Sequence, residues 1–278
     1  MSMDKIELAK DERLDDLEYE GLKIIQKPNL YCFSSDAVLL ANLVKAAKND
    51  TIVDFGTGSG VIAILALAKT KANKAIGFEI QKDMFELAKR NVSINDLDSK
   101  IEIINEDIKN ASKVLGKESV KVVVCNPPYF KASAGVKSDI GSIALSRTES
   151  SAKLEDIVKS AADILKYSGK FYMIHKSERL AEVLTSLSNN KLEPKVLTLI
   201  YPKASKAVDT FIVEAQKCGA PGLKINSVVV YEENGEMTPW AKKLYNKVWL
   251  SNRKRYFKSS ISTNFTWTSY ISTHRLRN

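Results

Sequence analysis

The 278-residue chain has the composition of an ordinary globular protein, with 44% hydrophobic and 27% charged residues, and it is long enough to bury a substantial core. No apolar stretch approaches the roughly 20 residues that cross a bilayer. The first residues also lack the apolar core of a signal peptide, so we expect a cytoplasmic protein without a membrane segment. The net charge of +9 favours a polyanionic partner but does not choose between RNA, DNA and simple solvation.

Cysteine and histidine usage gives no sign of a disulfide framework or a metal site. The three cysteines, Cys32, Cys125 and Cys218, are far apart in the sequence and form no CxxC pair. The two histidines, His175 and His274, have no neighbours of the kind that ligate metals. We therefore expect a protein that needs no metal.

From about residue 51, short β-branched runs alternate with segments that suit helices. We expect strands at residues 51–55, 75–79, 101–104, 120–125, 170–174, 196–201 and 209–214. We expect helices at residues 60–70, 82–93, 153–165 and 177–188, with a short link at 111–115. The last two strands leave no room for a crossover helix, which suggests an antiparallel pair at one sheet edge. The pattern predicts an α/β fold with a doubly wound, mostly parallel sheet.

Charge divides the chain into two parts. Residues 249–278 hold six Lys and Arg residues and no acid, so this tail carries +6 and residues 1–248 carry only +3. We expect one domain over residues 1–248. The tail, which is also rich in Ser and Thr, is either an RNA-binding arm or an unstructured terminus.

A glycine-rich loop follows the first predicted strand. Residues 54–60 read DFGTGSG and open a helix, which is where an α/β sheet binds a nucleotide-like ligand. Gly56, Gly58 and Gly60 let the backbone approach such a ligand closely, and the helix amides point toward it. Their spacing departs from the GxGxxG dinucleotide fingerprint, so the loop by itself is a weak signal.

Carboxylates follow three successive predicted strands. Asp54 could face an ammonium group, Glu79 could accept both hydroxyls of a ribose, and Asp107 could accept from an adenine amine. Each acid alone could instead cap a helix or lie in solvent at a strand end. Together they suit a ligand with a cationic amino acid, a ribose and an adenine, and they would repel a pyrophosphate. This favours S-adenosylmethionine over NAD.

The stretch CNPPYF, residues 125–130, leaves the fourth predicted strand on the same sheet edge as the glycine loop. The side-chain oxygen of Asn126 and the carbonyl of Pro127 could accept both hydrogens of an aromatic amine, which favours the pyramidal nitrogen of methyl transfer. The prolines, including Pro128, stiffen the loop, and Tyr129 and Phe130 could stack on an extruded base. A plain turn would explain an isolated NPPY, but not its position after this loop and these acids.

With these motifs the chain resembles the class I methyltransferases that modify planar amino groups. Residues 26–41, 146–149, 201–206 and 211–215 are similar to bacterial tRNA1(Val) adenine-N6-methyltransferases, and the resemblance covers about residues 15–245. It implies a Rossmann-like fold with a seven-stranded sheet and an antiparallel edge strand. It also implies transfer from S-adenosylmethionine, leaving S-adenosylhomocysteine, to the adenosine immediately 3′ of the anticodon in a valine tRNA.

The resemblance assigns roles to single residues. It implies donor contacts from Ser35, Asp36, Asp54, Gly56, Gly58, Gly60, Glu79, Asp107 and Asn126, and a target adenine held by Asn126, Pro127, Pro128 and Tyr129. Residues 1–50 would close over the donor pocket. An RNA substrate also requires cations near the pocket, and the candidate contacts there are Phe130, Lys131, Lys137, Arg147, Lys203 and Lys206.

Other functions stay open. NPPY also serves methylation of a glutamine amide in release factors, but those enzymes carry a helical domain before the glycine loop, and only about 50 residues precede it here. Methylation of DNA usually needs a target-recognition region, for which there is little space after Tyr129. An adenine in rRNA is a further alternative substrate. A silent RNA-binding scaffold would not need Asn126 or the donor acids. We expect a monomer.

Overall fold

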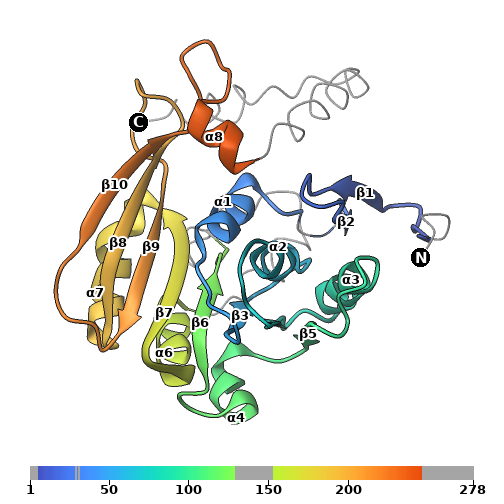
Figure 1. Ribbon diagram of the computed structural model, residues 1–278, viewed down its shortest axis with the longest axis horizontal. Coiled ribbons are helices and arrows are strands. Elements are labelled where there is room, and N and C mark those ends of the chain that lie inside the picture. The colour runs from blue at the N-terminus through green and yellow to red at the C-terminus, as the bar shows by residue number, and fades with distance from the viewer. Residues whose placement is uncertain (1–5, 29, 31, 129–152, 246–278) are drawn as a thin grey trace, which may run out of the picture.

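The computed structural model describes residues 6–28, 30, 32–128 and 153–245 (Figure 1). Two short antiparallel strands, β1 (Arg13–Asp16) and β2 (Lys23–Gln26), form a hairpin near the N-terminus. Helix α1 (Ser35–Leu43) follows the hairpin and leads into the main sheet.

The main sheet is built from strands and helices that alternate along the chain. Its first half contains β3 (Thr51–Phe55), α2 (Val61–Lys69), β4 (Lys74–Phe78), α3 (Lys82–Ser93), β5 (Ile101–Ile104), α4 (Ala111–Leu115) and β6 (Val120–Cys125). Its second half contains α6 (Leu154–Ile164), β7 (Leu165–Lys176), α7 (Leu180–Asn189), β8 (Leu192–Tyr201), β9 (Thr210–Lys217), β10 (Lys224–Val229) and α8 (Pro239–Leu244). Short 3-10 helices, Ile108–Asn110 and Ser177–Arg179, precede α4 and α7.

The strands form one eight-stranded sheet in the order β10-β8-β9-β7-β6-β3-β4-β5. Only β9 is antiparallel to its neighbours, β7 and β8, and β10 runs parallel to β8. The predicted doubly wound, mostly parallel fold is confirmed, as is the antiparallel pair of β8 and β9. The sheet has eight strands instead of the expected seven, and the antiparallel strand β9 lies between β7 and β8, inside the sheet and not at its edge. The sequence KINSVV of β10 gave no clear strand signal because this edge strand is largely exposed.

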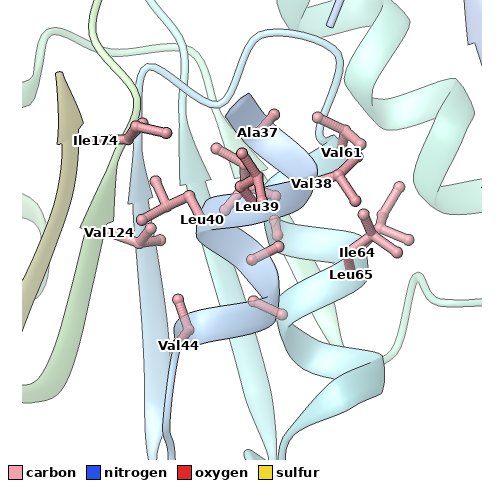
Figure 2. Packing of buried hydrophobic residues seen from close by; sticks show 14 of the residues in the cluster. Ala37, Val38, Leu39, Leu40, Val44, Val61, Ile64, Leu65, Val124 and Ile174 are labelled. Carbon is pink, nitrogen blue, oxygen red and sulfur yellow. The ribbon is translucent and has the colours of Figure 1, made fainter. Parts of the chain in front are cut away.

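Helices cover both faces of the sheet, as the alternation of buried residues along the strands requires. Ile52, Val122 and Val124 face α1 and α2 in one apolar cluster, while Val53 and Val123 belong to the cluster under α6 and α7. Figure 2 shows α1 lying beside α2, with Leu40 directed toward the strands.

Helix α1 is a central part of this packing, although no helix was expected there. Five consecutive residues at positions 37–41 are buried between α2 and the sheet. Burial of a leucine such as Leu39 or Leu40 contributes about 1.5–3 kcal/mol. The described part of the predicted N-terminal segment is thus bound to the sheet through α1.

The expected absence of a membrane segment and the expected domain boundary at residue 248 concern parts of the chain that the structure describes incompletely. Within residues 6–245, excluding the gaps at 29, 31 and 129–152, no helix is long and apolar enough to cross a membrane. The proposed tail at residues 249–278 lies outside the described residues, and the domain boundary at residue 248 stays a prediction.

Candidate active site

The candidate site lies where the strand order of the sheet reverses. β3 sits between β4 and β6, and its last residue, Phe55, pairs with the last residue of each neighbour. Gly56, Glu79 and Asn126, which come next on the three strands, therefore leave the sheet side by side at its carboxyl edge. Open α/β sheets bind ligands at this reversal point.

The glycine loop has a backbone that few other residues could adopt. Gly56, Gly58 and Gly60 have φ values of +69°, +57° and +85°, all in the left-handed region that favours glycine. The amide of Thr57 donates to the carbonyl of Phe78 at 2.9 Å, which ties the loop to the end of β4. The loop therefore approaches β4 closely while its other side faces the crevice.

Asp54 is fully buried at the base of this loop. Its Oδ2 accepts a hydrogen bond from the hydroxyl of Thr57 at 2.6 Å, whereas its Oδ1 has no hydrogen-bond partner among the described residues. Burial is the main cause that raises the pKa of Asp54 to about 7; the Thr57 hydroxyl and the backbone amide of Ala63 oppose the rise, and the charge of Glu79 adds to it. A buried, unsatisfied carboxylate oxygen suits an ammonium group of a ligand.

Gly77 makes room for this arrangement on the neighbouring strand. It pairs with Asp54 in register, and a Cβ atom at Gly77 would lie 2.8 Å from Cγ2 of Thr57. Any larger residue would displace Thr57, so this glycine lets the threonine hydroxyl reach Asp54.

Glu79 is 5% exposed, and two backbone amides hold its carboxylate. Its Oε2 accepts from the amide of Gly58 at 2.9 Å, and its Oε1 accepts from the amide of Gln81 at 2.8 Å. Burial raises the pKa of Glu79, and these amide bonds oppose the rise. Each oxygen keeps a second lone pair, so the carboxylate can still accept two ribose hydroxyls.

The sequence analysis overlooked two residues beside Glu79. Ile80 follows it directly and is 45% exposed, which is unusual for a large apolar side chain at a strand end and offers a flat surface to an aromatic ring. Asn105 donates to the carbonyls of Glu79 and Ile80 at 2.7 and 3.2 Å and fixes the turn after β4. The sequence signal for Ile80 was its position as an apolar residue directly after Glu79, the acid that we expect to bind the ribose.

Asp107 is already engaged with its own turn. Its Oδ1 accepts from the amide of Lys109 at 2.9 Å, and its Oδ2 lies 3.2 Å from the Lys109 ammonium. This is the helix-capping role that the sequence left open for each acid, so a donor contact from Asp107 stays a prediction.

Ser35 and Asp36 are the first residues of α1, which runs antiparallel to the parallel strands and begins toward their carboxyl edge (Figure 1). The hydroxyl of Tyr245, just after α8, donates to the carbonyl of Ser35 at 3.2 Å. The preceding Ser34 does not cap the helix with its side chain, and its Oγ is buried without a partner among the described residues. These polar groups therefore gather at the N-terminal end of α1.

The NPPY motif is described only up to its second proline. Asn126 is half-buried at the end of β6, Pro127 is buried and Pro128 is exposed. The remaining predicted contacts on this segment, Tyr129, Phe130, Lys131, Lys137 and Arg147, lie outside the described residues.

Lys203 and Lys206 lie on the same sheet edge but away from Asn126. They belong to the turn after β8, three strands from β6, a distance of roughly 14 Å at normal strand spacing. The ammonium of Lys203 donates to the carbonyl of Glu233 at 3.0 Å, and Ser205 donates to the Glu233 carboxylate at 2.9 Å. The structure therefore places these lysines three strands from Asn126 along the same edge, and a substrate contact from them stays a prediction.

Two basic residues that were not predicted from the sequence, Lys176 and Arg179, lie at and just after the end of β7. Lys176 ends β7, the strand beside β6, and forms an ion pair with Asp209 at 2.8 Å. Arg179 follows shortly after and pairs with Glu182. Their position could not be read from the sequence because it depends on which strand neighbours β6. Among the described residues, no group of three or more His, Cys, Asp or Glu could hold a metal ion.

Comparison with known proteins defines the family. Residues 22–192 match the family described as Methyltransferase small domain, a segment that contains the glycine loop, Glu79 and the NPPY motif. The chain belongs to this family. The methyltransferase family predicted from these motifs is thereby confirmed.

Individual relatives of the Methyltransferase small domain family refine the comparison. A protein from Methanocaldococcus jannaschii, assigned by name to the protein N5-glutamine methyltransferases, is 33% identical over 44% of this chain and 59% of its own length. A tRNA1(Val) (adenine(37)-N6)-methyltransferase from Photobacterium profundum is 23% identical over 65% of this chain and 75% of its own length. The match thus spans less than two thirds of the archaeal relative, and the expected similarity to the tRNA1(Val) enzymes is confirmed.

A solved structure confirms the fold class. The crystal structure of a protein from Agrobacterium tumefaciens, described as a predicted O-methyltransferase, matches with a TM-score of 0.62 at 24% identity, covering 76% of this chain and 95% of that one. At this identity the likeness shows the shared methyltransferase fold alone.

Proposed function

We propose that this protein transfers the methyl group of S-adenosylmethionine to the N6 amine of an adenine in tRNA. The observation that carries the proposal is the register of β3 with β4 and β6, which sets the glycine loop, Glu79 and Asn126 side by side. A site for the donor and a site for an amine would then share one crevice, as direct methyl transfer requires.

The described residues suit two parts of the proposed donor, its ammonium group and its ribose. The unsatisfied Oδ1 of Asp54 suits the donor's ammonium, and the amide-held carboxylate of Glu79 suits its ribose. Ile80 supplies an exposed apolar surface for the adenine ring. We infer that Ser35 and Asp36, at the start of α1, border the methionine end. When bound, S-adenosylmethionine supplies an electrophilic methyl group on a positively charged sulfur.

Asn126 would orient the nitrogen that receives the methyl group. An aromatic amine is a poor nucleophile because its lone pair is delocalised into the ring. Two acceptors, the Asn126 side-chain oxygen and the Pro127 carbonyl, would hold both amine hydrogens and turn the lone pair toward the donor. No strong base is needed before transfer, and the excess proton leaves the nitrogen afterwards through these acceptors to water.

The tRNA substrate is supported by similarity and charge. Several relatives that are 23–28% identical to this chain are named tRNA1(Val) (adenine(37)-N6)-methyltransferases. The net charge of +9 suits a polyanion. We propose the adenosine 3′ of the anticodon in a valine tRNA as the finer target.

A glutamine side-chain amide is the second candidate. It is also a planar amino group, and the archaeal relative with 33% identity is named for this reaction. The same two acceptors at Asn126 and Pro127 would orient an amide nitrogen equally well, so the geometry at β6 does not separate the two substrates.

The test is a competition between substrate classes. Labelled S-adenosylmethionine is incubated with the protein and unmodified tRNA, adenine-containing duplex DNA or a release factor, and the modified nucleosides or amino acids are identified by mass. We expect N6-methyladenosine in tRNA, at the adenosine 3′ of the anticodon of valine tRNA. Methyl transfer only to glutamine or only to DNA would overturn the tRNA assignment.

A further inference from the structure

The N-terminal hairpin is attached to α3 by two asparagine side chains. Asn91 Oδ1 accepts from the amide of Ile25 at 2.6 Å, and its Nδ2 donates to the carbonyl of Ile25 at 3.0 Å. Asn95 makes the same pair of bonds with Lys23, both at 2.8 Å. Asn91 on α3 and Asn95 in the turn just after it thus meet Ile25 and Lys23 on β2, and their two amide groups pair with the β2 backbone as a neighbouring strand would.

Asn91 also holds the glycine loop. The second hydrogen of its Nδ2 donates to the carbonyl of Ser59 at 2.9 Å, and Ser59 lies between Gly58 and Gly60. Asn91 is fully buried, so every hydrogen-bonding group of its side chain is used within the protein. One side chain therefore joins the hairpin to the loop that faces the donor.

Apolar side chains also link the hairpin to the glycine loop. Ile25, Met84 and Leu87 are buried together between β2 and α3. Cε of Met84 lies 3.6 Å from the position that a Cβ atom on Gly58 would occupy, so the methionine packs against the loop. The hairpin thus supports the glycine loop through a polar and an apolar contact.

The loop needs external support because its glycines permit many conformations. The amide of Gly58 is held by Glu79 on the crevice side, and the carbonyl of Ser59 is held by Asn91 on the opposite side. Loss of the second bond would leave a buried carbonyl unpaired and free the loop to rotate its amides away from the ligand.

The hairpin also reaches the start of α1. The buried side chain of Gln26 donates to Asp15 on β1, and its Oε1 accepts from the amide of Phe33 at 3.1 Å. Phe33 precedes Ser34 and the helix start. Both walls of the proposed donor pocket are thus connected to β2.

We propose that Asn91, held in place by the docked β1–β2 hairpin, is the positioning residue that orients the glycine loop and so sets the affinity for the donor. The inference rests on the proposed function in taking S-adenosylmethionine as the ligand of this loop. Since coupling between two sites is reciprocal, donor binding must in turn stabilise the docked hairpin.

Asn95 provides a matched control because it anchors the same hairpin without touching the loop. S-adenosylhomocysteine is titrated by calorimetry into the wild-type protein, Asn91→Ala and Asn95→Ala, and the stability of each is measured by urea unfolding. We expect Asn91→Ala to weaken binding by about tenfold or more, and Asn95→Ala by less than about twofold. Equal affinities of the two variants would overturn this inference alone. Absence of binding to the wild-type protein would overturn the proposed function and this inference with it.

A measurement on the unaltered protein covers the case in which Asn91→Ala does not fold. Hydrogen exchange of the Ile25 amide, which donates to Asn91, is followed with and without saturating S-adenosylhomocysteine. We expect exchange to slow by about tenfold when the ligand is bound. An unchanged exchange rate in the liganded protein would contradict the coupling.

Discussion

Asp54 combines complete burial with a carboxylate oxygen, Oδ1, that accepts no hydrogen bond from the described residues, and burial raises its pKa to about 7. The ordinary value is 3.8, so between these two pH values the folded protein holds a proton that the unfolded chain has lost. Ionising Asp54 therefore destabilises the unliganded protein as pH rises from about 4 to about 7. The ionised form is the one that attracts an ammonium group.

Asp54→Asn should separate these two effects. We expect the variant to be more stable than wild type at pH 8, on the order of 2 kcal/mol, with the difference disappearing toward pH 4. Its affinity for S-adenosylhomocysteine should be lower at pH 8 and should not rise between pH 6 and pH 8 as that of wild type does. Urea unfolding and calorimetry across this pH range measure both. A wild-type affinity independent of pH would contradict the role of Asp54.

Ile80→Asn tests the exposed apolar residue after Glu79. Because the side chain is 45% exposed, we expect unfolding free energy to change by less than about 0.5 kcal/mol. Donor affinity should fall by about tenfold, since an apolar contact with a ring is lost. Val114→Asn is the control, because Val114 is 46% exposed but lies on α4. Similar affinities of the two variants would remove Ile80 from the donor site.

Elements with a strong local pattern could be predicted from the sequence. The β-branched runs that became β3 and β6 are buried strands, and the glycines that follow β3 have left-handed φ values. These features depend on residues close in sequence. The side chains Glu79 and Asn126 were also selected correctly for the sheet edge, because each directly follows a strand.

Features that depend on distant residues could not be predicted. The pairing of α3 with the hairpin relies on Asn91, which reads as an ordinary polar position of an amphipathic helix, and on Asn95, which reads as an ordinary turn residue after that helix. β10 has an exposed, polar sequence, and its strand conformation comes from backbone pairing with β8. The separation of Lys203 from Asn126 follows from the order of strands, which the sequence leaves open.

The ion pair between Glu12 and Arg90 is a third link of the N-terminal segment to α3. The guanidinium donates to both carboxylate oxygens at 2.6 and 2.9 Å, and this bond lowers the pKa of Glu12. Stability from such a lowered pKa is present above the ordinary value and is lost as pH falls through the lowered one.

A double-mutant cycle with Glu12→Ala and Arg90→Ala measures this link. Because the Arg90 side chain is 42% exposed, we expect a coupling energy of only about 0.5–1 kcal/mol at pH 7. The coupling should be smaller at a second, acidic pH, because protonation of Glu12 below its lowered pKa removes the ion pair. Urea unfolding of the four proteins at both pH values gives the result. An equal coupling at both pH values would show that packing, and not charge, joins the two residues.

At the scale of the whole molecule, the positive charge is partly neutralised at the described carboxyl edge. Lys176 pairs with Asp209, and Glu233 faces Lys203 and Ser205. The net charge of +9 still favours a polyanion. Phosphate contacts would release counterions, which makes RNA binding depend on salt, whereas the compact donor site should respond little.

Salt titrations can separate the two ligands. We expect tRNA affinity to fall by about tenfold or more between 50 and 200 mM KCl, as for a protein with at least two phosphate contacts. The affinity for S-adenosylhomocysteine should change by less than about twofold over the same range. Filter binding and calorimetry provide the two values. A tRNA affinity that does not change with salt would argue against a phosphate-binding surface.

Donor binding and methyl transfer by Asn126→Ala probe the proposed active site most directly. Asn126 contacts the amine in the proposed site, and the donor is held mainly by the glycine loop and Glu79, so the variant should bind S-adenosylhomocysteine within about threefold of wild type. The rate of N6-methyladenosine formation on tRNA should fall by about 10²–10³ or more. Transfer within about tenfold of the wild-type rate, with donor binding intact, would contradict the assignment of Asn126 to the reacting amine.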